Sequence, residues 1–471
     1  MAGEAYDVIN EKRIDVNHWA YDEFKNLGIN CGRTIKRFIR TMITLSQNIG
    51  ESIAAASDDK AEAKAMYRLF ENKKVTEEVV LHAHRTATIQ KMKESGESII
   101  LSVQDTTMLN YATHKKTKGL GDFGAGSDDK GLIVHSALAV TPKGIALGLL
   151  DQHIWTRDPD ERGKRTEKRQ KPIEEKESYK WLRSMDQSQT GVSKDIRLVH
   201  VGDREADVYE FFDHAITNQQ DVLVRIVQNR ITSEACKLFD QIKQEPPAGQ
   251  IVAHIPRDTR RNLPAREATL EIRYSRLNIQ APRNTPKKFI GNRTLTLSFI
   301  HVQEVKPPEG MEPIEWYLAT SLDVASLDEA AEKITWYIHR WKIERFHYIL
   351  KSGCEIEKLQ NRTAERLQKL ILVYSIISAR ILGMTYMARQ YSEEPCTMFF
   401  EEEEWKVLYC IANRIPTAPD TAPTIKEAVS YLAKLGGFLG RKGDGEPGAK
   451  VIWKGLNELN IVLKYRNYLS P

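Results

Sequence analysis

Two aspartates each come just after a short apolar run, in positions from which a carboxylate can do chemistry. Asp105 follows the run at residues 98–104, and Asp203 follows the run at residues 196–201. Carboxylates can bind hard cations or move protons, and an open α/β sheet presents its functional groups at the C-terminal ends of its strands. A single aspartate in such a place is more often a helix N-cap or a turn residue. Two of them in one predicted sheet favour a functional interpretation.

A third carboxylate, Glu344, lies in a predicted helix whose start and end can be read from the sequence. Ser326-Leu-Asp-Glu329 is a capping box, and Gly353 is a stop signal. At ~100° per residue, an arc of ~60° on this helix holds four polar side chains, namely Tyr337, Arg340, Glu344 and Lys351. A solvated face with an i, i+4 ion pair is the structural alternative. Trp341 and Tyr348 near the same arc indicate that the stripe faces something other than bulk water.

A sheet and its flanking helices must position these groups. Apolar and alternating runs predict strands at four places, residues 98–104, 132–140, 145–154 and 196–201. The turn at Pro142-Lys-Gly144 predicts that the second and third strands form an antiparallel hairpin. More strand-like runs between residues 222 and 320 predict a mainly β insertion with basic connectors, at 256–266 and 282–293. Helical periodicity covers residues 34–81, 326–353 and 364–390 and continues beyond them.

Composition excludes several classes of protein. The chain has 471 residues, is 41% hydrophobic and carries a formal net charge of +5, which by itself does not indicate a nucleic-acid partner. The apolar run 370–379 is ended by Arg380 short of a membrane span, so we expect a buried helix and no membrane partner. The first residues lack a secretory pattern, which favours a cytoplasmic protein. Five cysteines without a C-x-x-C pair argue against a disulfide framework and a thiolate zinc site.

The run Tyr337-Ile-His-Arg340-Trp-Lys-Ile-Glu344 through Lys351 fits the Y-(2)-R-(3)-E-(6)-K signature of the insertion-sequence-four family of bacterial DDE transposases. Gln104-Asp-Thr-Thr107 and Val201-Gly-Asp-Arg-Glu-Ala-Asp207 resemble that family's two aspartate blocks. The order and spacing of the blocks are closest to the transposon-five type. The resemblance extends from about Tyr67 to Phe438, which is most of the chain.

The resemblance implies an α/β catalytic core with an RNase H-like mixed sheet and a mainly β insertion. It places the first aspartate on the first strand, the second on the fourth strand and the glutamate on a later helix. The implied domains are a helical DNA-end-binding domain at 1–80, a catalytic domain at 81–390 with its insertion at about 208–325, and a helical dimerisation domain at 391–471. The resemblance assigns no role to the charged segment 157–177.

Catalytic and metal-binding roles follow from the resemblance for Asp105, Asp203 and Glu344. Two Mg²⁺ ions per site, or Mn²⁺, would activate the attacking oxygen and relieve charge at phosphorus. Three carboxylates without a His/Cys cluster suit these hard cations rather than zinc.

DNA-binding roles follow from the resemblance for a further set of residues. Tyr337, Arg340 and Lys351 would bind transposon-end phosphates. Trp316 matches the family's tryptophan that stacks on a flipped base, although by itself it is a half-buried strand residue. Arg225 matches a DNA-contacting arginine. Three residues fall where the family reads its end sequence, Arg33, Lys36 and Arg68.

The sequence therefore predicts a cut-and-paste DNA transposase in the bacterial cytoplasm, associated with the nucleoid when bound to DNA. Its partners would be double-stranded transposon end repeats, target DNA and a second copy of the chain. Two alternatives remain: a non-catalytic DNA-binding inhibitor of transposition, and a structure-specific nuclease on the same fold. The presence of all three carboxylates argues against a non-catalytic inhibitor. A structure-specific nuclease would not need the stripe of Tyr337, Arg340 and Lys351.

Overall fold

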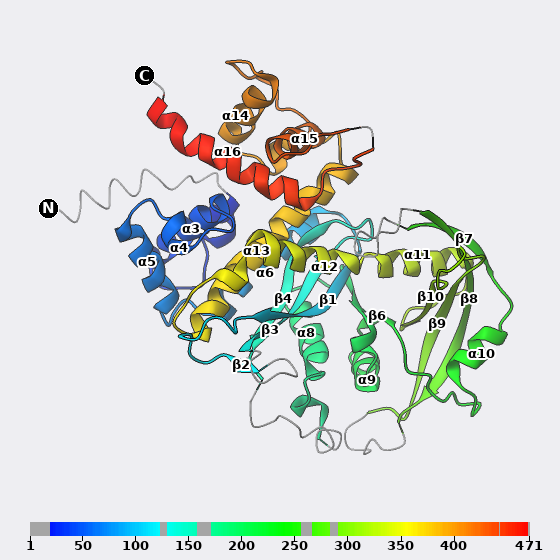
Figure 1. The fold of residues 1–471 in the computed structure, drawn as a ribbon. Coiled ribbons are helices and arrows are strands. Elements are labelled where there is room, and N and C mark those ends of the chain that lie inside the picture. Colours follow the sequence, from blue (N-terminus) through cyan, green and yellow to red (C-terminus); the bar gives the residue numbers. More distant parts are fainter. Residues whose placement is uncertain are drawn as a thin grey trace. The chain divides into compact units, whose positions relative to one another are not determined.

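A computed structural model describes residues 19–122, 130–157, 171–255, 266–282, 291–441 and 443–469. It forms two compact units, each built from separate segments of the chain (Figure 1). The first unit comprises Met1–Gly96, Thr106–Asp160 and Lys342–Pro471. The second comprises Glu97–Asp105 and Glu161–Trp341. The chain crosses from the second unit to the first inside strand β1 (Ile99–Asn110), directly after Asp105.

The second unit contains a mixed sheet whose strands follow the order β1-β5-β6-β10-β9-β8-β7. Its strands beyond β1 are β5 (Arg197–Gly202), β6 (Asp221–Arg225), β7 (Gly249–Ile255), β8 (Arg266–Gln280), β9 (Thr294–Glu304) and β10 (Glu315–Thr320). The pairs β1/β5 and β5/β6 are parallel, and every pair from β6/β10 outward is antiparallel. The predicted β insertion is thus hydrogen-bonded to the core strands as a continuation of one sheet.

Helices α8 (Tyr179–Gln189) and α9 (Tyr209–Thr217) bury aromatic side chains on this sheet. Trp181, Phe211 and Phe212 belong to one buried cluster with the inward residues of β6 and β9. Gly202 is needed at the end of β5, because a Cβ there would lie 2.5 Å from the Cβ of Ala206 and 3.3 Å from the Trp181 ring. This close approach fixes the turn that follows β5. The remaining helices of the unit are α10 (Leu238–Gln244) and α11 (Leu327–Ile338).

The first unit is organised around the long helix α13 (Ala364–Gln390). It packs, with α6 (Glu77–Glu94), against β4 (Ala146–Trp155), which pairs antiparallel with β3 (Lys130–Val140). Helix α13 is long and apolar enough to cross a membrane, but 83% of its most apolar window is buried inside the protein. Its apolar length is therefore used as the core of this unit, as the sequence predicts.

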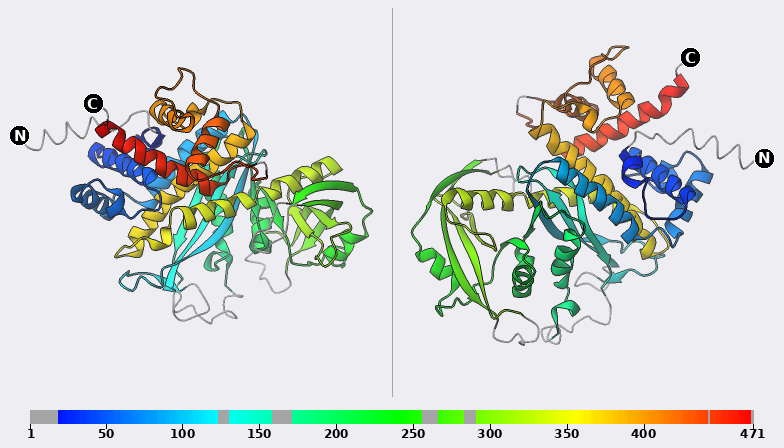
Figure 2. Two further views of the ribbon diagram at one scale, coloured as in Figure 1. Left: turned by 45° about the horizontal axis from the view of Figure 1, so that its top comes forward. Right: turned by 180° about the vertical axis from the view of Figure 1, so that it is seen from behind.

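Further helices precede and follow this core in the sequence (Figure 2). The N-terminal group is α2 (Trp19–Phe24), α3 (Gly32–Gln47), α4 (Ile53–Ala56) and α5 (Lys60–Glu71). The C-terminal group is α14 (Glu402–Asn413), α15 (Ile425–Leu435) and α16 (Ala449–Leu469), and α16 packs against α15. Thr424 and Glu427 form a capping box at the start of α15, with both bonds present.

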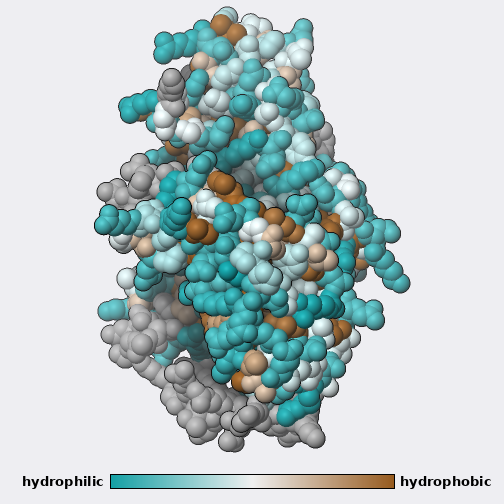
Figure 3. Space-filling model, turned by 90° about the vertical axis from the view of Figure 1, so that its right-hand side faces the viewer, coloured by the Kyte–Doolittle hydropathy of each residue, from teal (hydrophilic) through white to brown (hydrophobic). Residues whose placement is uncertain are grey.

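The predicted fold class is confirmed: a mixed sheet with helices, and helical regions on either side of it in the sequence. The four strands predicted around the aspartates are present, and β1 runs six residues further than expected. Most of segment 157–177 and of the two basic connectors lies outside the described residues. Figure 3 shows one face of the molecule, on which hydrophobic residues form small separate areas within a mainly hydrophilic surface.

The prediction of one continuous helix at 326–353 is wrong in one respect. Ser326 caps its start as expected, accepting the N–H of Glu329 at 3.2 Å. The helix is then interrupted, because the N–H of Arg340 bonds the carbonyl of Tyr337 at 2.9 Å, three residues back rather than four. A second helix, α12 (Trp341–Tyr348), follows and ends in a π-helical turn at Ile349–Gly353. The calculated 60° stripe therefore does not extend unbroken from Tyr337 to Lys351.

Stability is expected to fall as the pH drops below about 6.5, because two histidines are buried in the neutral form. Burial lowers the pKa of His200 on β5 to about 3, and that of His347 on α12 to about 3. The contribution of each neutral histidine to the free energy of unfolding is fully present above the unfolded pKa of 6.5. It is lost as the pH falls from there towards 3. The expected slope is about 1.4 kcal/mol per pH unit for each histidine.

Urea unfolding at several pH values between 7.5 and 5 measures this slope. The His200→Gln variant, which keeps a hydrogen-bonding side chain opposite Gln104, should have a flatter pH dependence than the original chain. An equal slope in both proteins would show that His200 does not titrate on unfolding.

Candidate active site

The two predicted catalytic aspartates lie level with each other on neighbouring strands. Val103 of β1 pairs with Val201 of β5 in a parallel ladder, and both are fully buried. Two residues further along the chain come Asp105, which is still inside β1, and Asp203, which is the first residue after β5; both are half-buried. Asp203 keeps an extended backbone and accepts the N–H of Glu205 at 2.8 Å, which caps the short turn that follows. Because side chains alternate along strands, both carboxylates project to the same face of the sheet.

Arg225 continues this row on the next strand. Gly202 of β5 pairs with Val224 of β6, so Asp203 is level with Arg225. Arg225 in turn pairs with Leu318 of the antiparallel strand β10. The structure therefore sets a carboxylate, a second carboxylate and a guanidinium side by side across three parallel strands.

An aromatic and cationic group extends from Arg225. The Arg225 guanidinium lies over the Trp316 ring at 5.9 Å, and its Nη2 donates to the carbonyl of Glu315 at 3.4 Å. The Trp316 ring meets the Tyr337 ring edge to face, with centroids 5.7 Å apart. Arg340, which is also buried, hydrogen-bonds the Tyr337 side chain. Four predicted DNA-binding residues of the second unit are thus in contact as one chain of side chains.

The electrostatics of this group favour binding an anion. Burial raises the pKa of Tyr337, and the charges of Arg340 and Arg225 oppose the rise. Tyr337 therefore remains a hydroxyl donor at neutral pH. Two buried or half-buried guanidinium groups beside that donor suit a phosphate group, which accepts charge-assisted hydrogen bonds.

Asp207 anchors the turn after Asp203, a role that sequence reasoning missed. Its buried carboxylate accepts the N–H groups of Val227 and Gln228, each at 2.7 Å, and pairs with Arg230. These bonds tie the turn after β5 to the segment just beyond Arg225. The signal was present, because Asp207 closes the same sequence block as Asp203.

The remaining predicted residues belong to the first unit. Glu344 is half-buried on α12. Lys351 donates to the carbonyl of Met108 at 2.6 Å, so it is bonded to the later part of β1. Also on α12, the Lys342 ammonium lies 3.2 Å from the centre of the Tyr386 ring. Burial lowers the pKa of Lys342 to about 7, and repulsion from Arg389 and Arg345 adds to the effect.

The N-terminal candidates lie on the outward faces of two helices. Helix α3 buries Phe38, Met42 and Leu45 and exposes Arg33 and Lys36. Arg68, on α5, is also exposed. These three cations are therefore positioned to contact a partner, and their side chains are not part of the hydrophobic core.

Among the residues that the structure describes, no group of three or more His, Cys, Asp or Glu side chains lies close enough to hold a metal ion. The pair that the sheet does align, Asp105 and Asp203, offers carboxylate oxygens, which suit Mg²⁺ or Mn²⁺. The aligned pair therefore fits a hard divalent cation, and a complete ligand set stays a prediction.

Comparisons with known proteins identify two segments. Residues 16–75 match the family model described as transposase DNA-binding. Residues 376–470 match the model described as the transposase Tn5 dimerisation domain. The chain is also similar to a piggyBac transposase solved by cryo-EM as a synaptic complex with hairpin DNA. That similarity has a TM-score of 0.35 at 8% identity, covering 94% of this chain and 74% of the other.

Proposed function

We propose that this chain is a DNA transposase of the Tn5 type and that it works by the cut-and-paste route, with Asp105, Asp203 and Glu344 as its catalytic carboxylates. One observation carries the proposal most directly: the register of β1 and β5 sets the two aspartates level and on one face. Arg225 stands next in the same row, where a scissile phosphate would need a cation. A structural role for both aspartates would not require this alignment.

The same carboxylates would hold the metal. Asp105 and Asp203 would provide oxygen ligands from neighbouring strands, and Glu344 would complete the set from α12. Two Mg²⁺ ions, or Mn²⁺, would supply Lewis-acid activation of the attacking oxygen and stabilise the leaving oxygen.

The neighbouring residues would bind and orient DNA. Tyr337 donates its hydroxyl, and Arg225 and Arg340 supply positive charge to phosphates near the cut. Trp316, already in contact with Arg225 and Tyr337, would stack on a base turned out of the duplex. The stacking surface and the phosphate donors would thereby act together on one nucleotide.

Excision would proceed by successive phosphoryl transfers. Water attacks a phosphodiester at the element's end, and the departing oxygen becomes a 3′-OH. That hydroxyl attacks the opposite strand, which closes a hairpin on the element and releases flanking DNA. A second water opens the hairpin and regenerates the 3′-OH, which finally attacks target DNA. In each step one phosphorus–oxygen bond forms as another breaks.

The two ends of an element would be held by two copies of the chain. Arg33, Lys36 and Arg68 of the N-terminal helices would contact the end repeats. Helices α14 to α16, which lie within the segment matched to a dimerisation domain, would pair the copies. This arrangement would bring two 3′-OH groups to one target site.

Incubation of the full chain with a duplex bearing the element's inverted repeats and Mg²⁺ tests the proposal. Denaturing gels should show a nick, then a hairpin, then strand-transfer products. Nicks without a hairpin or joined product would instead support a structure-specific nuclease. Tight binding without any cut would support a non-catalytic inhibitor.

A further inference from the structure

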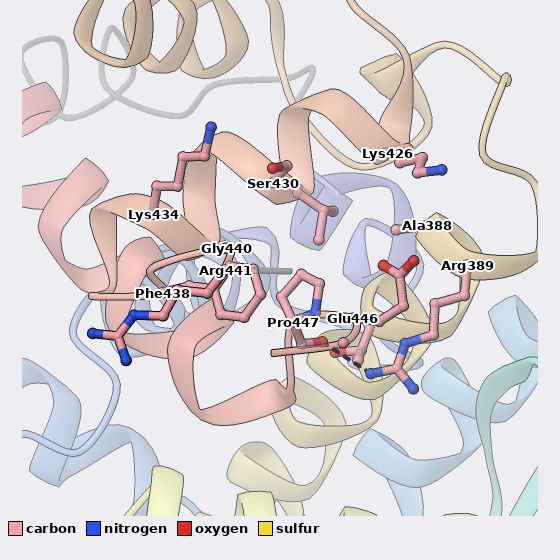
Figure 4. A pocket seen from close by; sticks show the side chains of 13 residues that line it. Ala388, Arg389, Lys426, Ser430, Lys434, Phe438, Gly440, Arg441, Glu446 and Pro447 are labelled. Atoms are coloured by element: carbon pink, nitrogen blue, oxygen red, sulfur yellow. Dashed lines mark hydrogen bonds between the residues drawn. The ribbon is translucent and has the colours of Figure 1, made fainter. Parts of the chain in front are cut away.

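A cationic pocket lies within the first unit, between the end of α13, helix α15 and the loop at 438–447 (Figure 4). Its cavity volume is about 280 Å³. Four cationic side chains line it, Arg389, Lys426, Lys434 and Arg441, together with a single carboxylate, Glu446. Every lining residue belongs to the segment matched to a dimerisation domain.

Most of the pocket's positive charge is not neutralised by the protein, because one carboxylate stands against four cations. Over the described residues, none of the four cations forms an ion pair with a carboxylate within 4.0 Å. Arg389 donates to the carbonyl of Pro447 at 2.9 Å, which holds its guanidinium at the pocket without removing its charge. Protein surfaces usually intersperse opposite charges, so an uncompensated group of cations around a cavity indicates an anionic ligand.

Tyr386 on α13 lies beside the pocket and contacts two basic side chains. The Arg389 guanidinium lies 5.1 Å from the centre of the Tyr386 ring, and the Lys342 ammonium lies 3.2 Å from the same centre. Because the pKa of Lys342 is lowered to about 7, Lys342 adds only part of a charge at neutral pH. Four other cations spread around one cavity suit a polyanion with repeated phosphates better than a single small anion.

The lining also has an apolar part. Val429, Phe438 and Pro447 contribute side chains beside the cations. Two glycines with left-handed backbones shape the loop, Gly440 with φ of 62° and Gly445 with φ of 66°. The pocket therefore offers both charge and a surface for a deoxyribose.

We propose that this pocket binds backbone phosphates of DNA, so that the segment matched to a dimerisation domain also contacts DNA directly. The inference rests on the proposed function in that the polyanion is DNA. It adds a binding site formed by α13, α15 and the loop at 438–447, apart from the N-terminal helices and from the residues around Asp203.

Salt-dependent DNA binding by the full chain tests this site. The Lys426→Gln/Lys434→Gln double variant changes two exposed lysines, so it should fold normally, with an unchanged melting temperature. Binding to a duplex of arbitrary sequence is measured by fluorescence anisotropy without divalent metal, at several salt concentrations. The slope of log K against log salt should become about two units shallower, with an affinity at least about tenfold lower at 0.1 M salt.

Lys406→Gln is the matched control. Lys406 is a half-exposed lysine of the same segment, but it is already paired with Glu402 and does not line the pocket. Its slope should equal that of the unmodified chain. An unchanged slope in the double variant would overturn the proposal.

Inorganic phosphate distinguishes a DNA site from a small-anion site. In one outcome, phosphate raises the melting temperature of the original chain but not of the double variant, and both proteins bind DNA with the same slope of log K against log salt. In that case the pocket binds small anions and the proposal is wrong. The result of this binding assay does not depend on the proposed cleavage activity, because binding is measured without the metal that cleavage requires. A shallower slope in a chain that fails to cut DNA would keep this site and reject the catalytic proposal.

Discussion

Replacement of Asp203 by asparagine is expected to lower the rate of DNA nicking at least about 1,000-fold, which corresponds to about 4 kcal/mol of transition-state stabilisation. The variant is conservative in shape. Asparagine can still accept the N–H of Glu205, so the turn after β5 keeps its cap. The charge needed to hold a hard cation is lost, and the neutral amide is a much weaker ligand for it. Nicking of an end-repeat duplex with Mg²⁺, followed over time, measures the loss.

Asp195→Asn is the control for this change. Asp195 is an exposed aspartate in the turn before β5, where it accepts the Ser193 hydroxyl at 2.9 Å. It should nick DNA at the unmodified rate. Glu344→Gln should resemble Asp203→Asn, with DNA binding retained in both. Normal nicking by either carboxylate variant would remove that residue from the catalytic set.

Replacement of Gly455 by valine is expected to separate helices α15 and α16. A Cβ at Gly455 would lie 1.9 Å from the carbonyl oxygen of Leu432, and one at Gly436 would lie 1.9 Å from that of Val451. The two helices therefore pack backbone to backbone at reciprocal glycines. Backbone atoms cannot turn aside as a flexible side chain can, so the helices must move apart. Overpacking costs about 1–3 kcal/mol in tolerant cores and more where backbones must shift.

Urea unfolding and limited proteolysis of the C-terminal region measure the effect. Gly455→Val should lower stability by several kcal/mol, expose α16 to protease and weaken pairing of two chains on end DNA. Gly448→Val is the matched control, because a Cβ at Gly448 meets nothing within 4 Å. Equal protease resistance of the two variants would show that α15 and α16 do not depend on this contact.

The sequence predicted the elements whose signals are local. The strands before Asp105 and Asp203 and the cap at Ser326 depend on neighbouring residues, and all were located correctly. Helix α13 was predicted with its observed ends, because its apolar run is long and its start is capped by Thr363. Asp203 directly follows a strand as expected, whereas Asp105 lies inside β1, which continues to Asn110; the equal level of the two aspartates needed the β1/β5 register.

The parts that were missed depend on contacts between distant segments. The break at Arg340 occurs where Tyr337 turns to meet Trp316, and no local residue signals it. The bond from Lys351 to Met108, which joins residues 243 positions apart, was not foreseen, while its role in binding DNA phosphates stays a prediction. The cationic pocket combines α13 with a loop some 50 residues later, and a net charge of +5 for the whole chain conceals it.

The discontinuous first unit has a consequence for synthesis of the protein on the ribosome. Its early helices are fastened to α13: Lys369 bonds the carbonyl of Phe70 across 299 positions, and Tyr374 bonds that of Glu51 across 323. At roughly 5–20 residues per second, translation of that interval takes about 15–60 s. During this time the nascent N-terminal helices have no α13 to pack against. Chaperones and proteases therefore encounter these helices before α13 exists, and the length of that exposure depends on how fast residues 71–369 are translated.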